Sequence, residues 1–208
     1  MNNFEHPQAQ VRMQAALAAG TSAQIEVLPL LIQRSGVDED FFVRDTLTWA
    51  LTRMPVHEVI PLLVRELDAD RAQRPFAASQ ALHTLSKLKV ATTWNELKIR
   101  SELLHRSDTA QTAWRTFAGL VPDADMEWLG EQLIQELGQG EADIQRSLSR
   151  ALAELEWRGA SISKLLSGMA GKAAQAHAVA TLKLFTDPDS DFLADLEAAR
   201  RVDNMGPC

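Results

Sequence analysis

A chain of 208 residues, of which 46% are hydrophobic, can bury the core of one large domain or two small ones, which excludes disorder as a description of the whole chain. Its formal charge of −7 argues against broad, sequence-independent binding of nucleic acid, because such binding depends on lysines and arginines that displace counterions. The only cysteine is Cys208, which excludes an intramolecular disulfide and a cysteine-based metal site.

The predicted elements are all helices, because residues that favour helices are abundant and only 8 prolines and 10 glycines interrupt them. In chain order the helices are predicted at about 7–19, 23–34, 40–54, 56–68, 72–88, 92–106, 108–120, 125–138, 141–157, 160–170, 172–186 and 189–201. Pro29 and Pro61 lie at matching places in two of them and predict a bend or a late first turn. No linker is visible, so we expect a single domain, 1–208, with the first and last helices as caps and 202–208 as a frayed tail.

One helix recurs along the chain, and we call it the B helix. Its copies carry small or apolar residues at the first, fifth, eighth and ninth positions, and they begin at Val11, Val43, Arg74, Thr109, Ile144 and Ala174. The ninth positions lie about 30 to 35 residues apart and are Ala19, Leu51, Leu82, Phe117, Leu152 and Leu182. A second helix, the A helix, separates successive copies. The pattern predicts an array of helical hairpins.

The best-kept copies resemble the HEAT repeat. In the B helices, Val11-Arg12 is followed by Ala15 and Ala18-Ala19, and Asp40 with Val43-Arg44 is followed by Leu47 and Ala50-Leu51. The A helices contain VLPLL and VIPLL. This combination is similar to the short bacterial HEAT-like repeats that also occur in phycobilisome lyases. The resemblance spans nearly the whole chain and implies an all-α fold, an α-α superhelix or HEAT-repeat solenoid of about twelve helices.

Later copies depart from the pattern, since the Val-Arg pair becomes Arg74-Pro75, Thr109-Ala110, Ile144-Gln145 and Ala174-Gln175. No feature for bilin attachment is visible. Because HEAT arrays serve many unrelated roles, the resemblance implies a fold and leaves the function open.

The repeat register predicts a binding surface. In HEAT solenoids the B helices line the concave side, and here their third, sixth, seventh and tenth positions should face that groove. Aromatic residues and arginines are frequent in binding hot spots, so we expect a protein or peptide partner, possibly an acidic one. The candidate contact residues are Asp45, Trp49, Gln80, His83, Trp114, Arg115, Arg146 and Arg150. Alternatively, Trp49 or Trp114 packs between repeats while the arginines are solvated.

Two other functions stay open. HEAT-like alkylpurine DNA glycosylases are similar in size and also use tryptophans and charged residues in a concave groove, although the net charge here makes nucleic acid an unlikely partner. A self-associating structural subunit is the third reading, because Met13, Ala16 and Leu17 make the first helix unusually apolar. The oligomeric state is not predicted.

No assembled catalytic, metal or cofactor motif is present, which predicts a protein that is not an enzyme. Asp187, Asp189 and Asp191 imitate the start of a calcium loop, but Phe192 and Ala198 stand where glycine and glutamate are needed, so helix capping explains these aspartates better. The N-terminus lacks a secretory signal, and no apolar run approaches roughly 18 residues, so we expect a cytoplasmic protein without a membrane partner.

Overall fold

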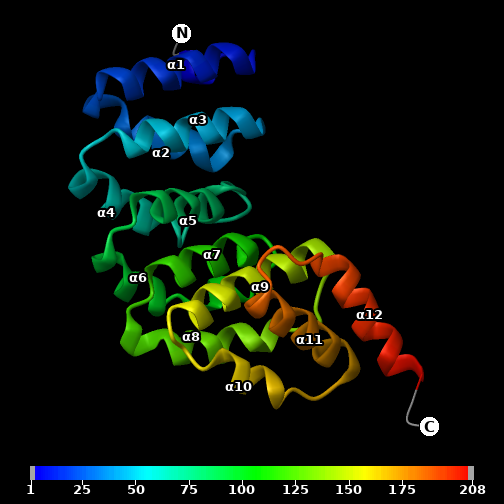
Figure 1. Cartoon of the computed structure of the whole chain (residues 1–208). Helices are drawn as coiled ribbons and strands as arrows, with labels where there is room; N and C mark the ends of the chain where they lie inside the picture. The colour runs from blue at the N-terminus through cyan, green and yellow to red at the C-terminus, as the bar shows by residue number, and fades with distance from the viewer. Residues whose placement is uncertain (1–2, 206–208) are drawn as a thin grey trace. The chain divides into compact units, whose positions relative to one another are not determined.

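A computed structural model describes the backbone of residues 3–205 and the side chains of residues 3–201. Within that range the chain forms twelve α-helices joined by turns and short 3-10 helices, with no strand (Figure 1). The predicted all-α fold is confirmed. Cys208 and the end of the predicted tail, 206–208, lie outside the described residues.

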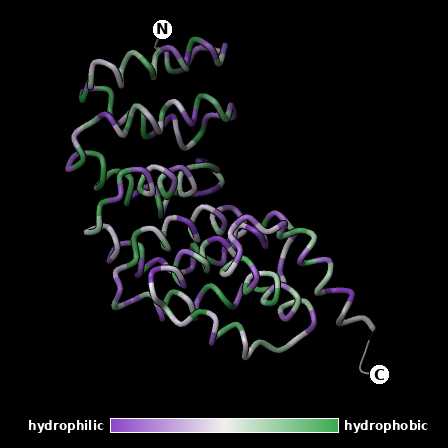
Figure 2. The backbone as a smooth tube through the Cα atoms, viewed as in Figure 1, coloured by the Kyte–Doolittle hydropathy of each residue, from purple (hydrophilic) through white to green (hydrophobic). Residues whose placement is uncertain are grey.

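The chain divides into two compact units, Met1–Glu96 and Leu97–Cys208, which are described separately. The prediction of one domain and of a continuous superhelix therefore stays a prediction. Hydrophobic and hydrophilic residues alternate along the helices of each unit, as expected for amphipathic helices around a shared core (Figure 2).

The first unit has two layers of helices. Its B helices form one row, in which α3 packs between α1 and α5, while α2 and α4 form the second layer. The helices are α1 (Ala9–Ser22), α2 (Leu28–Val37), α3 (Phe41–Thr52), α4 (Val56–Glu66) and α5 (Ala77–Leu88), followed by α6 (Trp94–Lys98) at the boundary. Short 3-10 helices lie at Asn3–Glu5, Ile25–Val27 and Ala91–Thr93.

The second unit repeats the arrangement. A row runs from α7 through α9 and α11 to α12, with α8 packed beside α10 in the other layer. The helices are α7 (Ala110–Leu120), α8 (Met126–Leu133), α9 (Ala142–Trp157), α10 (Ile162–Ser167), α11 (Lys172–Thr186) and α12 (Phe192–Met205). Short 3-10 helices lie at Ser101–Leu104, Asp123–Asp125 and Ile134–Glu136.

Prolines and caps explain several helix boundaries. The Asp40 side chain accepts hydrogen bonds from the backbone N–H groups of Phe42 and Val43, which starts α3. Pro29 lies in the first turn of α2, after a 3-10 turn, which confirms the predicted late start. The helix predicted from 72 begins only at Ala77, because Pro75 disfavours helical backbone at the residue before it. The helix predicted at 92–106 is wrong as one element, since it is broken after Lys98.

The predicted core register is confirmed in α3, α7 and α9, whereas α1 buries Arg12, Ala16, Ala19 and Gly20, one residue later than predicted, and Leu182 of α11 is only half-buried. Leu51, Leu82 and Leu152 are fully buried. The buried set of α3 is Val43, Leu47, Thr48, Ala50 and Leu51, and it recurs in α7 at Thr109, Ala113, Trp114, Thr116 and Phe117, as the predicted alignment requires. In α5 it recurs at Ala77, Ala81, Leu82, Thr84 and Leu85, one turn later than predicted. The late start of α5 explains this shift.

In several B helices a side chain near the first turn donates a hydrogen bond to a backbone carbonyl oxygen five or six residues earlier, and we call this bond the brace. Arg12 Nη1 donates to the carbonyl oxygens of His6 and Pro7, and Arg44 Nη1 donates to those of Asp38 and Glu39. Where the Val-Arg pair is lost, other donors make the same bond five or six residues back. These are Thr109 Oγ1 to Leu103 O, Gln145 Nε2 to Gly140 O and Gln175 Nε2 to Met169 O. These three degenerate copies thus keep the brace while changing the residue, whereas Arg74 of the remaining degenerate copy bonds Glu66 and the carbonyl oxygen of Ile32 instead.

Candidate functional site

The predicted groove residues fall in both units, so they are described as two surfaces. Asp45, Trp49, Gln80 and His83 belong to the first unit, on α3 and α5. In the second unit, Arg115 of α7 and Arg146 and Arg150 of α9 form what we call the arginine face. A single groove that joins the two sets stays a prediction.

The arginine face lies on two helices that pack against each other. From Ala113 to Leu120 the buried residues of α7 correspond one to one to those of α9 from Leu148 to Leu155, so Arg115 and Arg150 occupy equivalent positions of neighbouring helices, and both are exposed. Arg146, one turn before Arg150, is half-buried. Neither Arg146 nor Arg150 makes a side-chain hydrogen bond or ion pair with the part of the chain that the structure describes. The predicted contrast between buried Leu152 and exposed Arg150 is confirmed.

The acidic neighbours of these arginines lie on their own helix. Asp143 precedes Arg146 by three residues and Glu154 follows Arg150 by four, and both carboxylates are exposed. Such pairs along a helix surface interact weakly, at about 0.2 to 0.5 kcal/mol each. Within residues 3–201, whose side chains the structure describes, no ion pair links these residues, so a ligand with several negative charges has only these weak interactions to overcome.

Trp114 does not face a groove, which corrects its assignment as a contact residue. Its side chain is 2% exposed, and its indole N–H donates to the carbonyl oxygen of Leu104 at 2.8 Å. Thr48 and Ser149 hold the same sixth position of their helices and are also buried. In α3 and α9 the sixth position points at the next B helix in the row, since Thr48 meets Thr84 and Ser149 meets Thr181, whereas Trp114 reaches back to the 3-10 helix Ser101–Leu104.

Trp49 stays partly open, with 39% of its surface exposed. One edge of its ring lies against α1, where a Cβ added to Gly20 would come within 2.5 Å of Trp49 Cζ3. The glycine thus makes room for the indole, which covers the backbone of α1 and still presents its other side to solvent.

The other predicted groove residues of the first unit are Asp45 on α3 and Gln80 and His83 on α5. The exposed Asp45 carboxylate is 3.9 Å from His83 Nε2, and His83 and Gln80 are half-buried. Because the register of α5 is shifted by one turn, His83 rather than Gln80 is the counterpart of Trp49. The predicted ridge that places Gln80 beside Trp49 is therefore wrong.

The sequence did not reveal a buried polar cluster around His177 in α11. The imidazole Nδ1 accepts from the backbone N–H of Gly138 at 3.0 Å, so Nε2 carries the proton and donates to Gln145 O and Ser149 Oγ. Burial lowers the pKa of His177 to about 4. A protonated Nε2 cannot take a proton from Ser149, and both side chains are fully buried, so this Ser–His pair serves packing.

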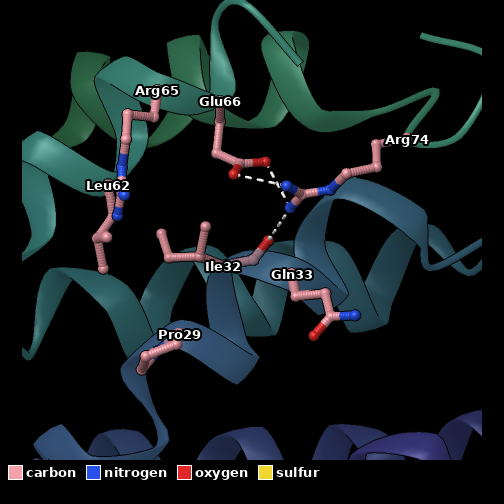
Figure 3. Close-up of a pocket in the computed structure, with 7 residues that line it drawn as sticks. All are labelled: Pro29, Ile32, Gln33, Leu62, Arg65, Glu66 and Arg74. Atoms are coloured by element: carbon pink, nitrogen blue, oxygen red, sulfur yellow. Dashed lines mark hydrogen bonds and ion pairs between the residues drawn. The ribbon is translucent and has the colours of Figure 1, made fainter. Parts of the chain in front are cut away.

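A small cavity of about 130 Å³ lies between α2 and α4 (Figure 3). Its apolar side is formed by Pro29, Ile32 and Leu62. Two of its polar residues are engaged with the fold, because Arg74 donates to Glu66 and to the carbonyl oxygen of Ile32, while the side chains of Gln33 and Arg65 are exposed at its edge. A polar ligand that reached Arg74 would compete with these bonds.

Of the three aspartates that imitate a calcium loop, Asp191 has a structural role. Asp191 Oδ1 accepts from the backbone N–H groups of Leu193 and Ala194 and caps α12, as the capping interpretation predicted. Among residues 3–205 no group of three or more His, Cys, Asp or Glu side chains is arranged to hold a metal ion. Within the same range, no helix combines the length and the apolar character that crossing a membrane requires.

Comparison with known proteins gives no relative, since no protein-family model and no curated protein matches the chain. The resemblance to HEAT repeats therefore stays a prediction.

Proposed function

We propose that the chain is a protein-interaction scaffold without catalytic activity, and that its arginine face binds an acidic segment of a protein partner. The observation that supports the proposal is the state of Arg146 and Arg150, whose guanidinium groups have no partner among the described residues. Arg115 adds a third cation at the equivalent position of the neighbouring helix. In a chain with a net charge of −7, such a concentration of arginine favours an anionic ligand.

The chemistry of arginine favours a carboxylate-rich segment. A guanidinium presents five donors in a rigid fork and can hold a carboxylate through two parallel hydrogen bonds. Arginine is also frequent among the few residues that carry most of the free energy of binding at an interface. Arg146 and Arg150 present such donors one turn apart on α9, and Gln111 and Arg115 are exposed at the equivalent positions of α7.

The test is affinity capture from the native host with the tagged full chain, followed by quantitative mass spectrometry and titration of the captured partner. The informative variant is Arg146→Glu with Arg150→Glu. The matched control is Arg53→Glu with Arg65→Glu, which makes the same change of charge at exposed arginines of the first unit. We expect the control to retain the partner and the α9 variant to bind it at least tenfold more weakly.

Two results would overturn the proposal. One is a partner that binds the α9 variant as tightly as the unchanged chain. The other is salt-sensitive binding of a duplex oligonucleotide that only the α9 variant loses, because the ligand of the arginine face would then be a phosphate backbone. Circular dichroism of both variants checks that the helices are intact.

A further inference from the structure

A second surface of different chemistry lies on the exposed side of α3. Phe41 is 62% exposed and Phe42 is 70% exposed, and Asp45 and Trp49 follow on the same side of the helix at the spacings of one and two turns. We call Phe41, Phe42, Asp45 and Trp49 the aromatic stripe. Residues seven apart on a helix are separated by about 10 Å along its axis, so Phe42 and Trp49 form two apolar anchors with a carboxylate between them.

The stripe is held rigidly. The Asp40 cap fixes the first turn of α3, and the rings of Phe41 and Phe42 meet edge to face with centroids 5.6 Å apart. Behind them the Arg44 guanidinium lies 4.1 Å from the centre of the Phe76 ring and donates to two backbone carbonyls. The same guanidinium lies 6.0 Å from the centre of the Phe41 ring, so the first turn of α3 is anchored next to the exposed pair. A rigid, exposed aromatic pair is typical of an interaction surface.

The accessible charge around the phenylalanine end of the stripe is negative. Glu39 and Asp45 are exposed, and the Asp45 side chain retains 64% of its accessible surface. Arg12, Arg34 and Arg44 are turned inward, because the first two bond Asp38 and Arg44 bonds carbonyl oxygens, while the exposed Arg53 lies at the other end of the stripe, one turn after Trp49. A bound segment therefore meets carboxylates at the rim of the aromatic rings.

We propose that the aromatic stripe binds a peptide segment of a protein partner that carries two large apolar side chains about 10 Å apart with a lysine or arginine between them. In a helical segment these apolar residues are seven apart, which places both on the same face of the helix. The cation pairs with Asp45 while the apolar side chains cover Phe42 and Trp49. The sign of the recognised charge is opposite to that at the arginine face, so this surface does not depend on the proposed function.

The test is selection of a phage-displayed random peptide library on the full chain, followed by titration of the enriched peptides. Two variants alter the stripe: Phe41→Ser with Phe42→Ser, and Asp45→Lys, which changes only an exposed carboxylate. The control is Ile99→Ser with Val179→Ser, two hydrophobic residues of the second unit that are 73% and 56% exposed. Arg146→Glu with Arg150→Glu serves as the second control, because it alters only the arginine face.

We expect enriched peptides with the spaced apolar pair and a net positive charge. They should bind both stripe variants at least tenfold more weakly and both controls as tightly as the unchanged chain. The proposal is overturned if no such peptide is enriched, if the enriched peptides are acidic, or if they bind the Phe41→Ser/Phe42→Ser variant unchanged. Enriched acidic peptides that only the arginine-face variant loses would support the proposed function and reject the stripe.

Discussion

His177 Nε2 and Ser149 Oγ lie 2.9 Å apart in the interior of the second unit, on adjacent helices α11 and α9. Thr181 Oγ1 donates to the carbonyl oxygen of His177, so Ser149 donates to Thr181 and accepts from His177. Each hydrogen bond of this cluster thus has an assigned donor and acceptor, and all of the bonds can form together only while the imidazole is neutral.

The neutral state of His177 makes stability depend on pH. Burial lowers the pKa of His177 to about 4 in the folded chain, against about 6.5 when unfolded, so between these values the unfolded state binds the additional proton. The free energy of unfolding should fall by roughly 3 kcal/mol as the pH drops from 6.5 to 4. Urea titrations across this range measure the slope. In His177→Gln, whose amide can bond the same neighbours without titrating, this part of the slope should vanish; an identical slope would contradict the assignment.

Asp38 should be essential to the first unit. Burial alone would raise the pKa of Asp38, but hydrogen bonds from Arg12 and Arg34 outweigh it and hold the pKa below its ordinary value. Asp38→Asn removes the carboxylate and leaves the buried Arg12 without its counter-ion, at a cost of about 3 to 5 kcal/mol. Chemical denaturation measures this loss. Asp45→Asn, on an exposed side chain, is the control and should change stability by less than about 0.5 kcal/mol.

Two glycine substitutions should have opposite effects. In Gly20→Ala the new Cβ would approach Trp49 Cζ3 to 2.5 Å and the Cα of Ala50 to 2.8 Å, so α1 and α3 must separate, at about 1 to 3 kcal/mol. In Gly119→Ala the new Cβ would meet no atom within 4 Å, and the gain in helix propensity should stabilise the chain by about 0.5 to 1 kcal/mol. Thermal melts of both variants give the comparison. Equal shifts would mean that α1 does not pack as described.

The loss of stability caused by an introduced charge should depend on how deeply the substituted residue is buried. Leu82→Asp places a carboxylate at a fully buried position of α5 and should prevent folding of the first unit. Leu193→Asp, at a position of α12 that is 39% exposed, should reduce the free energy of unfolding far less. Circular dichroism and thermal melts distinguish the two, and equal tolerance would refute the register of α5.

The period of the apolar residues predicted the number of helices and most of the core, because burial of a helix face follows the helical repeat directly. The exposure of Arg115 and Arg150 followed from the same periodicity. The register of α5 was not predicted correctly. Pro75 delays the start of this helix by about one turn, and an alignment of the repeats without gaps cannot include such a delay. Trp114 was misplaced because its indole N–H bonds the carbonyl oxygen of Leu104 in the preceding 3-10 helix, a contact that the periodicity of its own helix does not specify.

The functional surfaces were predicted less completely. Phe41 and Phe42 precede the aligned segment of α3, so the comparison of repeats passed over them. A signal was present in the sequence, because two consecutive phenylalanines directly after an Asp cap cannot both enter the core from the first turn of a helix. The cluster around His177 gave no comparable signal, since its partners come from two other segments of the chain, the turn at Gly138 and helix α9.

The brace at the start of the B helices has a consequence for how such a chain can grow. Its donor and its acceptor carbonyl lie within the same seven residues, as in Arg44 with Asp38 and Gln145 with Gly140. A duplicated hairpin would carry this bond with it intact, whatever its new neighbours are. The pair of Arg12 and Asp38 joins different hairpins and would be divided by an insertion between them. New units should therefore be accepted more readily next to the self-contained turns of Gln145 and Gln175 than between α1 and α3.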